Sequence, residues 1–371
     1  MELFGKSRGD KIIWRIVFAL FALSFLLVFS YSVSIQRLIM HTIHLLSGFV
    51  IIKIVSKIPY KYFTNFSFIL FIVSIVLLFW ALLTPSYVLD DFNNPVDASR
   101  WINIFGFTFQ PSELAKFSLI LLLARNLSLN NLSFKNSIIP IFIPVLLIIL
   151  LTIKSNFSTA LIIFFISSIL LFISNYLFKD LLKFGGLTIM SFIILVLLVL
   201  PFMPHNRVET WKGRVTDWWS SNKNQNYQQF WHDNYQQAVA YQCMSSVGLF
   251  SKPGSRNCDI IPKADTDFIY AFAVCEYGLI MGPFILCLYL LFFQRIIYIS
   301  RRIKSQFPYL LVLGLGSLIL VQALINMGVN LSLLPNTGQT LPFLSRGGSS
   351  IWMMSLSIGI ILNISSVNYE K

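Results

Sequence analysis

Apolar residues in this chain form long, unbroken blocks separated by short polar connectors. No Asp, Glu, Lys or Arg occurs in residues 155–178, 184–206 or 305–345. About 20 such residues are enough for a helix to cross a bilayer. The blocks are continuous rather than alternating, which argues against a transmembrane β-barrel. No small-residue cleavage site follows the first block, near residues 12–34, so we predict a membrane span there rather than a signal peptide.

The composition agrees with a membrane protein. The 371 residues are 56% hydrophobic and 12% charged, whereas soluble proteins carry about 25% charged residues. We therefore predict an all-α polytopic membrane protein, in which residues 1–371 form a single transmembrane domain of about ten helices. The predicted spans cover residues 12–33, 36–57, 67–87, 110–126, 136–153, 155–175, 183–203, 267–296, 308–334 and 343–366.

The basic residues indicate the topology. A formal charge of +13 would suit nucleic acid binding, but Lys and Arg gather in every second connector between the predicted spans. This is the positive-inside pattern. We therefore predict no nucleic acid partner, a location in the cytoplasmic (inner) membrane and both termini in the cytoplasm. The basic residues in these connectors include Lys6, Arg8, Lys11, Lys53, Lys57, Lys61, Arg125, Lys135, Lys179, Lys183, Arg301, Arg302 and Lys304.

The longest polar segment, residues 204–266, is predicted to be an extracytoplasmic loop. It contains four tryptophans, and indole rings favour the lipid headgroup layer. An apolar residue recurs there at every fourth position, at Trp231, Tyr235, Val239 and Cys243. A helix over this segment would carry an apolar stripe. It could lie flat on the membrane against a lipid substrate or pack on the helix bundle, and both arrangements remain open.

The cysteines and histidines do not indicate a metal site. The chain has four of each, and none has metal-ligand spacing. Cys243 and Cys258 share the long loop and could form a disulfide bond, which the sequence leaves open. Cys275 and Cys287 fall inside a predicted span, where packing is their expected role.

Ionisable residues at the membrane boundary mark the candidate chemistry, because charged groups are costly there. Pro111 and Ser112 suit the start of a helix. Glu113 and Lys116 lie three residues apart on one face of that helix and can pair. The pair is either a buried structural ion pair or part of a substrate site. Arg100, ahead of this helix, can hold a phosphate with two hydrogen bonds.

A second candidate lies where the long loop enters the eighth predicted span. Asp267 occupies this water–membrane boundary, where a partly desolvated carboxylate can act as a general base. A helix cap is the alternative role for the same residue. Glu276 follows nine residues later, inside the span, where an unpaired carboxylate would be costly.

Gly, Pro, Asn and Ser are dense around the junction of the last two predicted spans, from position 326 to position 350. This composition indicates irregular backbone, which is tolerated within a membrane only against protein or a wet cavity. The N–H groups of Gly347 and Gly348, at the start of the last helix, could cradle an anion beside Arg346. A tight turn is the alternative. Residues 154–160 form a further polar interruption between two spans.

Three segments are similar to the hallmark blocks of the SEDS family, whose members include FtsW and RodA. They are RWINIFGFTFQPSELAKF, TDFIYAFAVCEYG and NMGVNLSLLPNTGQTLPFLSRGGSS. Their order, the long outer loop before the second block and the ten predicted spans extend the resemblance over nearly the whole chain. Gln339 and Thr340 in the last block lean slightly toward the division branch (FtsW) over the elongation branch (RodA).

The resemblance implies a peptidoglycan glycosyltransferase that polymerises lipid II and works with a class B penicillin-binding transpeptidase among divisome or elongasome proteins. Asp267 matches the family's essential aspartate, which implies that it is the catalytic general base. Basic residues would stabilise the pyrophosphate leaving group, alone or with a divalent cation, Mg²⁺ or Mn²⁺. The substrate-binding candidates are Arg100, Trp101, Glu113, Lys116, Ser345, Arg346, Gly347, Gly348 and Ser349.

Three features depart from the family pattern, and one is the loop from Gly248 to Gly254, which is poorer in glycine than that pattern. Many members have two successive glutamates before a glycine, where this chain has Cys275 and Glu276. Many have an aspartate where this chain has Asn156, which removes a second carboxylate. The departures concern donor binding and leave the class of enzyme unchanged.

Two other functions remain open. A flippase that moves the lipid-linked precursor outward would use Glu113 and Lys116, but it needs polar groups along the full membrane depth. This sequence concentrates them at the outer boundary. A non-catalytic scaffold that activates a transpeptidase would tolerate the loss of Asp267. For a polymerase, one carboxylate base without a nucleophile partner favours an inverting single displacement.

Overall fold

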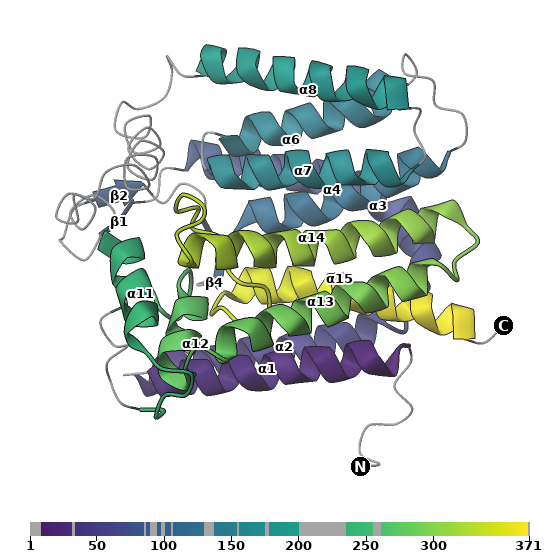
Figure 1. The fold of residues 1–371 in the computed structure, drawn as a ribbon. Helices are drawn as coiled ribbons and strands as arrows, with labels where there is room; N and C mark the ends of the chain where they lie inside the picture. Colours follow the sequence, from purple (N-terminus) through teal and green to yellow (C-terminus); the bar gives the residue numbers. More distant parts are fainter. Residues whose placement is uncertain are drawn as a thin grey trace.

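The computed structural model describes residues 9–31, 34–84, 87–89, 95–97, 101–104, 107–129, 137–153, 156–174, 178–199, 235–254 and 261–369. In these ranges the long helices lie side by side, and two short antiparallel hairpins, β1–β2 and β3–β4, accompany them (Figure 1). The strands are β1 (Tyr87–Leu89), β2 (Pro95–Asp97), β3 (Ile102–Ile104) and β4 (Phe107–Phe109). The helices are α1 (Lys11–Tyr31), α2 (Ile35–Val55), α3 (Tyr60–Leu83), α4 (Pro111–Ser128), η1 (Ile138–Phe142), α6 (Ile143–Ile153), α7 (Phe157–Ile173), α8 (Phe178–Val199), α11 (Tyr235–Ser246), α12 (Ile269–Tyr277), α13 (Met281–Ser300), α14 (Gln306–Asn330) and α15 (Gly348–Tyr369).

The prediction of an all-α polytopic membrane protein is confirmed. Each predicted span coincides with helical structure, with ends that differ by a few residues. In the described part of the chain, α1, α2, α3, α13, α14 and α15 are each long and apolar enough to cross a membrane, and shorter apolar helices cover residues 138–153 and 157–173. The helices α11 and α12 lie at one end of the bundle, here called the loop end (Figure 1). The start of α1 lies at the opposite end, here called the basic end.

The prediction of one continuous helix over residues 267–296 is wrong. The helix α12 ends at Tyr277 and α13 begins after a break at Gly278, whose φ of 96° and ψ of 170° suit glycine. The segment after α11 crosses the break, since Leu279 N donates to Gly248 O at 3.0 Å and Ser251 N donates to Tyr277 O at 3.3 Å. A hydropathy profile cannot show this break, because the segments on both sides of it, α12 and α13, are apolar.

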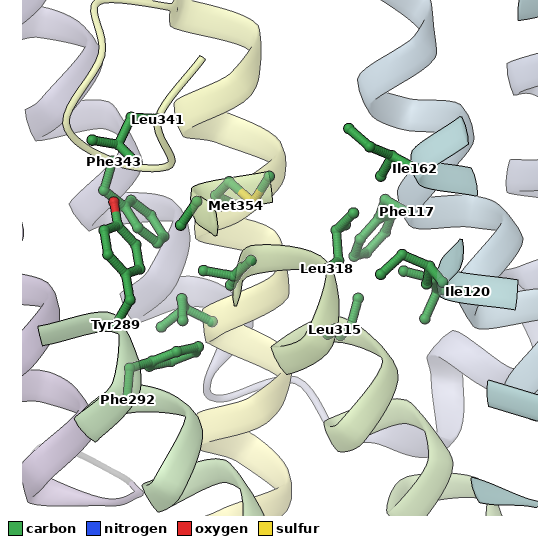
Figure 2. Packing of buried hydrophobic residues seen from close by; sticks show 14 of the residues in the cluster. Phe117, Ile120, Ile162, Tyr289, Phe292, Leu315, Leu318, Leu341, Phe343 and Met354 are labelled. Carbon is green, nitrogen blue, oxygen red and sulfur yellow. The ribbon is translucent and has the colours of Figure 1, made fainter. Parts of the chain in front are cut away.

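The helix α14 lies at the centre of the bundle and contacts α4, α7, α13 and α15. Its most apolar window is 78% buried, compared with 28% for α2 and for α3. Leu318 of α14 faces Phe117 and Ile162 across the core (Figure 2). A Cβ at Gly316 would lie 2.6 Å from Ile296 of α13, so glycine permits the close approach of these two helices. Side chains on α14 can therefore reach segments on several sides.

The helix α11 packs against the bundle, which is one of the two alternatives left open. It contacts α12 and α14, and its Val239 is 5% exposed. Val239 and Cys243 pack on the core whereas Tyr235 is 48% exposed, so the buried face follows the predicted stripe only in part. Trp231 and Cys258 lie outside the described residues, and the pairing of Cys258 with Cys243 stays open.

The break at Gly278 gives a first prediction. A Cβ there would lie 2.5 Å from Leu249 O, in a backbone conformation that L side chains rarely adopt. We expect Gly278→Ala to destabilise the protein by about 3 kcal/mol, seen as a lower Tm in detergent. Gly186→Ala is the matched control, because nothing lies within 4 Å of a Cβ at this helical position. Its Tm should stay equal or rise slightly, and equal Tm values for both variants would contradict the prediction.

Candidate functional site

The candidate site forms around the connection from α14 to α15, residues 331–347. The backbone here is irregular, with Phe343 at a φ of 65°, yet Gln339 and Ser345 are only 4% and 2% exposed. The hydroxyl group of Tyr289 donates to Pro342 O, and Phe343 packs beside Tyr289 (Figure 2). The prediction of irregular backbone that lies against protein is therefore confirmed.

Asp267 lies directly ahead of α12, and its backbone is held from α14. The Nδ2 atoms of Asn326 and Asn330 donate to its carbonyl oxygen at 2.8 and 3.1 Å. Both asparagines are fully buried. The N-cap residue of α12 is Phe268, which argues against a cap role for Asp267. Its half-buried carboxylate has no hydrogen bond or ion pair within the described residues, so it is available to a substrate.

The two residues before Asp267 are held by the last sequence block. Arg346 pairs with Asp265 through Nε and Oδ2 at 2.5 Å, and its backbone N donates to Asp265 O at 2.7 Å. The Ser345 hydroxyl donates to Thr266 O at 2.6 Å. The same hydroxyl accepts from Leu341 N at 2.8 Å. Protein groups therefore hold all three carbonyl groups of residues 265–267, which fixes the approach to Asp267.

Glu113 and Lys116 form the predicted ion pair, deep in the bundle. Lys116 Nζ lies 2.7 Å from Glu113 Oε1 and donates to Gln322 Oε1 on α14 at 3.0 Å. Gln322 Nε2 in turn donates to Thr340 O at 3.2 Å. All three side chains are buried: Glu113 is 4% exposed, Lys116 is 2% exposed and Gln322 is 0% exposed. Glu113 Oε2 is buried with no hydrogen-bond partner among the described residues.

The start of α7 is tied to the same connection. Asn156 accepts from Thr159 N at 3.3 Å and thereby caps α7. Gln339 Nε2 donates to the Thr159 hydroxyl at 3.0 Å. The asparagine that departs from the family pattern therefore has a structural role at the N-terminus of a helix.

Glu276 has partners despite its position inside a span. Its Oε1 accepts from Gly254 N at 2.7 Å and from the Ser30 hydroxyl. These bonds tie the segment after α11 to α1 and α12. Among the described residues, the buried carboxylate is thus satisfied by hydrogen bonds, without a cation.

The remaining predicted site residues are placed as follows. Arg100 lies outside the described residues, and Trp101 is half-buried just ahead of β3. Ser349 is buried in the first turn of α15. A Cβ at Gly348 would lie 2.6 Å from Nε2 of His44, so close packing against α2 accounts for glycine there without an anion.

The sequence analysis missed Gln322 as a site residue and used Gln339 only to compare family branches. Both carry amides that hold backbone or hydroxyl groups of the site. The signal that could have found them is an uncharged polar side chain within the long uncharged stretch 305–345. Such residues need internal partners in a membrane.

Comparisons with known proteins agree with this structure. The model of the FtsW/RodA/SpoVE family of cell cycle proteins matches residues 10–370. A relative from Enterococcus hirae, named "Probable peptidoglycan glycosyltransferase FtsW", is 33% identical over 72% of this chain and 68% of its own length. The relative of the same name from Escherichia coli O157:H7 is 28% identical over 96% of this chain and 85% of its own length.

Two solved structures share the fold. One is a chain from "Structural coordination of polymerization and crosslinking by a peptidoglycan synthase complex", with a TM-score of 0.78, 21% identity and coverage of 98% of this chain and 99% of that chain. The other is the rod shape determining protein RodA of Thermus thermophilus, with a TM-score of 0.70, 21% identity and coverage of 98% of both chains. The family match over residues 10–370 and the 33% identical relative show that this multi-pass membrane protein belongs to the FtsW/RodA/SpoVE family, also called the SEDS family.

Proposed function

We propose that this chain is a peptidoglycan glycosyltransferase that polymerises lipid II into glycan strands at the outer face of the cytoplasmic membrane. Its relatives carry the name of this activity. The single observation that carries the proposal is the state of Asp267, whose peptide carbonyl is held by two buried amides while its half-buried carboxylate stays available. A fixed and available carboxylate suits a general base.

The reaction needs a base and a stabilised leaving group. The sugar hydroxyl of the acceptor attacks the anomeric carbon of the donor chain, and Asp267 accepts the hydroxyl proton. The bond from the anomeric carbon to the pyrophosphate oxygen breaks, and polyprenyl pyrophosphate departs with the electron pair. One base without a nucleophile partner favours inversion in a single displacement.

Arg346 is the proposed cation for the pyrophosphate. Its side chain is 34% exposed, and its ion pair with Asp265 uses Nε, which leaves the terminal guanidinium nitrogens for a phosphate. Lys116 is buried and already pairs with Glu113 and Gln322. We therefore propose that Lys116 supports the site from within the bundle and does not contact the pyrophosphate. Arg100 stays a second candidate for the phosphate.

A divalent cation, Mg²⁺ or Mn²⁺, is part of the proposal. Among the described residues, no three His, Cys, Asp or Glu side chains lie close enough together to hold a metal ion. Mg²⁺ on a substrate phosphate needs only one or two carboxylates from the protein. Because Asp265 is paired with Arg346 and Asp267 is the proposed base, substrate phosphates and water would supply most ligands of such an ion. The ion would neutralise charge on the pyrophosphate.

The difference in charge between the basic end and the loop end supports one orientation of the protein in the membrane. Lys53, Lys57 and Lys61 lie at the basic end, around the turn from α2 to α3, whereas Asp267 lies at the loop end beside α12. We propose that the basic end faces the cytoplasm, with both termini, in line with the positive-inside pattern. As its structural neighbour comes from a peptidoglycan synthase complex, we propose a class B penicillin-binding transpeptidase as partner, and the FtsW names of the relatives support the division branch.

Replacement of Asp267 tests the mechanism. We expect Asp267→Asn to lower lipid II polymerisation at least 100-fold, because a general base contributes about 10²–10⁴ in rate. Its Tm should be unchanged, since the carboxylate has no described partner. The measurement is glycan strand formation by the reconstituted protein with its cognate transpeptidase. The control is Thr266→Ala, because the Thr266 hydroxyl donates to Lys263 O and to no other group in the described part of the chain.

Full polymerisation by Asp267→Asn would contradict the assignment of the base. If wild-type protein also forms no strands, the flippase and scaffold alternatives are favoured. Lipid scrambling in vesicles then distinguishes them, because only a flippase moves the lipid.

The two amides behind Asp267 give a prediction on positioning. Asn326→Ala with Asn330→Ala leaves the carbonyl oxygens of Asp267 and Gln339 and the N–H of Ala271 without these partners. The expected cost in stability is about 1–3 kcal/mol for each buried group. We expect polymerisation to fall about 10- to 100-fold in protein that is still folded, because a small displacement of a catalytic group is costly. Gln237→Ala is the control, since its amide donates to Val329 O and Leu334 O, both at 2.9 Å, away from Asp267.

The control leaves two carbonyl oxygens without a donor, so it should lose somewhat less stability than the double variant and keep most of its activity. Equal losses of activity in the control and the double variant would contradict a positioning role and would mean that the asparagine pair only stabilises the fold.

The ion pair of Glu113 and Lys116 gives a prediction that separates its two alternatives. Lys116→Met leaves a buried carboxylate uncompensated and should destabilise the protein by about 3–5 kcal/mol. Adding Glu113→Gln should restore most of the Tm, because the charge is then removed. Polymerisation that returns with the Tm assigns the pair to the fold, whereas a stable but inactive double variant assigns it to the substrate path. A double variant as unstable as Lys116→Met would contradict the argument.

A further inference from the structure

A groove of about 520 Å³ opens where α2 turns into α3, at the basic end and away from Asp267. Apolar side chains form its wall. Val50, Ile54 and Tyr62 are 51%, 55% and 56% exposed, and Ile58 is 36% exposed. The groove has the size of a small-molecule site, for which about 300–1,000 Å³ is typical. Its wall therefore suits hydrocarbon rather than a polar ligand.

Two lysines border the same groove. Lys53 and Lys57 are four residues apart at the C-terminal end of α2, and both are exposed. Two ammonium groups one helical turn apart above an apolar wall suit an anionic head on a hydrocarbon chain.

A buried amide fixes the turn that shapes the groove. Asn363 of α15 is 3% exposed, and its Nδ2 donates to Ser56 O at 2.9 Å. Its Oδ1 accepts from Tyr60 N at 3.0 Å. One side chain thus holds the last turn of α2 and the first of α3, so the groove is already formed without a ligand.

We propose that this groove binds one anionic glycerophospholipid of the adjacent leaflet. Its phosphate lies between the ammonium groups of Lys53 and Lys57, and an acyl chain lies along Val50 and Ile54. Basic residues at this end also serve as a topology signal, which needs no cavity. The groove and its fixed turn distinguish a site from that diffuse attraction, and the inference does not depend on the proposed enzymatic activity.

The proposed contact between the lipid headgroup and the two lysines is tested by changing the charge of each. The purified protein is titrated in detergent with phosphatidylglycerol or phosphatidylcholine, and bound lipid is counted by native mass spectrometry. We expect one preferred phosphatidylglycerol, and an affinity about 30-fold lower in Lys53→Gln with Lys57→Gln, since each lysine near an anionic lipid adds roughly a factor of five. Lys179→Gln with Lys183→Gln on α8 removes the same charge and should change the affinity less than twofold.

The proposed contact between the acyl chain and the apolar wall is tested by filling the groove. Ile54→Trp fills the apolar wall and keeps both lysines, and it should lower phosphatidylglycerol binding about tenfold. Ile189→Trp, at a position on α8 that is 52% exposed, is the control and should have no effect. Equal losses in the two lysine pairs, or unchanged binding in Ile54→Trp with a wild-type Tm, would overturn the proposal in favour of diffuse attraction.

Discussion

Neutral amides on one central helix satisfy the irregular backbone of this protein, and the rest of the site depends on them. A peptide group within a membrane has no water to bond to, so the protein must supply each donor or acceptor. Gln322, Asn326 and Asn330 of α14 do so for carbonyl groups of Thr340, Gln339 and Asp267. An amide does this without bringing a charge into the bundle, where a charge would be costly.

These amides join segments that are far apart in the sequence. The stretch before α12 and the connection before α15 are both irregular, and each alone would carry unsatisfied peptide groups. Held against α14, they also bond to each other, through Ser345 and Thr266 and through Arg346 and Asp265. The central position of α14, closely approached by α13 at Gly316, makes this possible. The central helix of the bundle therefore organises the site at its end.

The sequence was sufficient for the helices and for the irregular connection around the candidate site, because both follow from composition, whereas the choice of Asp267 came from the family resemblance. Uncharged blocks long enough to span a membrane predicted the helices, and dense Gly, Pro, Asn and Ser predicted the irregular connection. Hydropathy could not show the break at Gly278, which depends on a positive φ and on pairing with residues before it. It also could not rank the charged residues, because partners such as Gln322 for Lys116 come from distant positions.

Asp265 and Asp267 show how position rather than residue type separates two carboxylates. They are two residues apart in the same turn, yet Asp265 is buried against Arg346 whereas Asp267 is half-buried with no described partner. Pairing with Arg346 offsets the charge of the first. The second remains the carboxylate that a substrate hydroxyl can meet, and pairs of acids in unlike surroundings are how enzymes divide roles between similar groups. The ion pair of Asp265 therefore serves the proposed reaction twice, because it anchors the turn that carries Asp267 and it holds Arg346 beside the base.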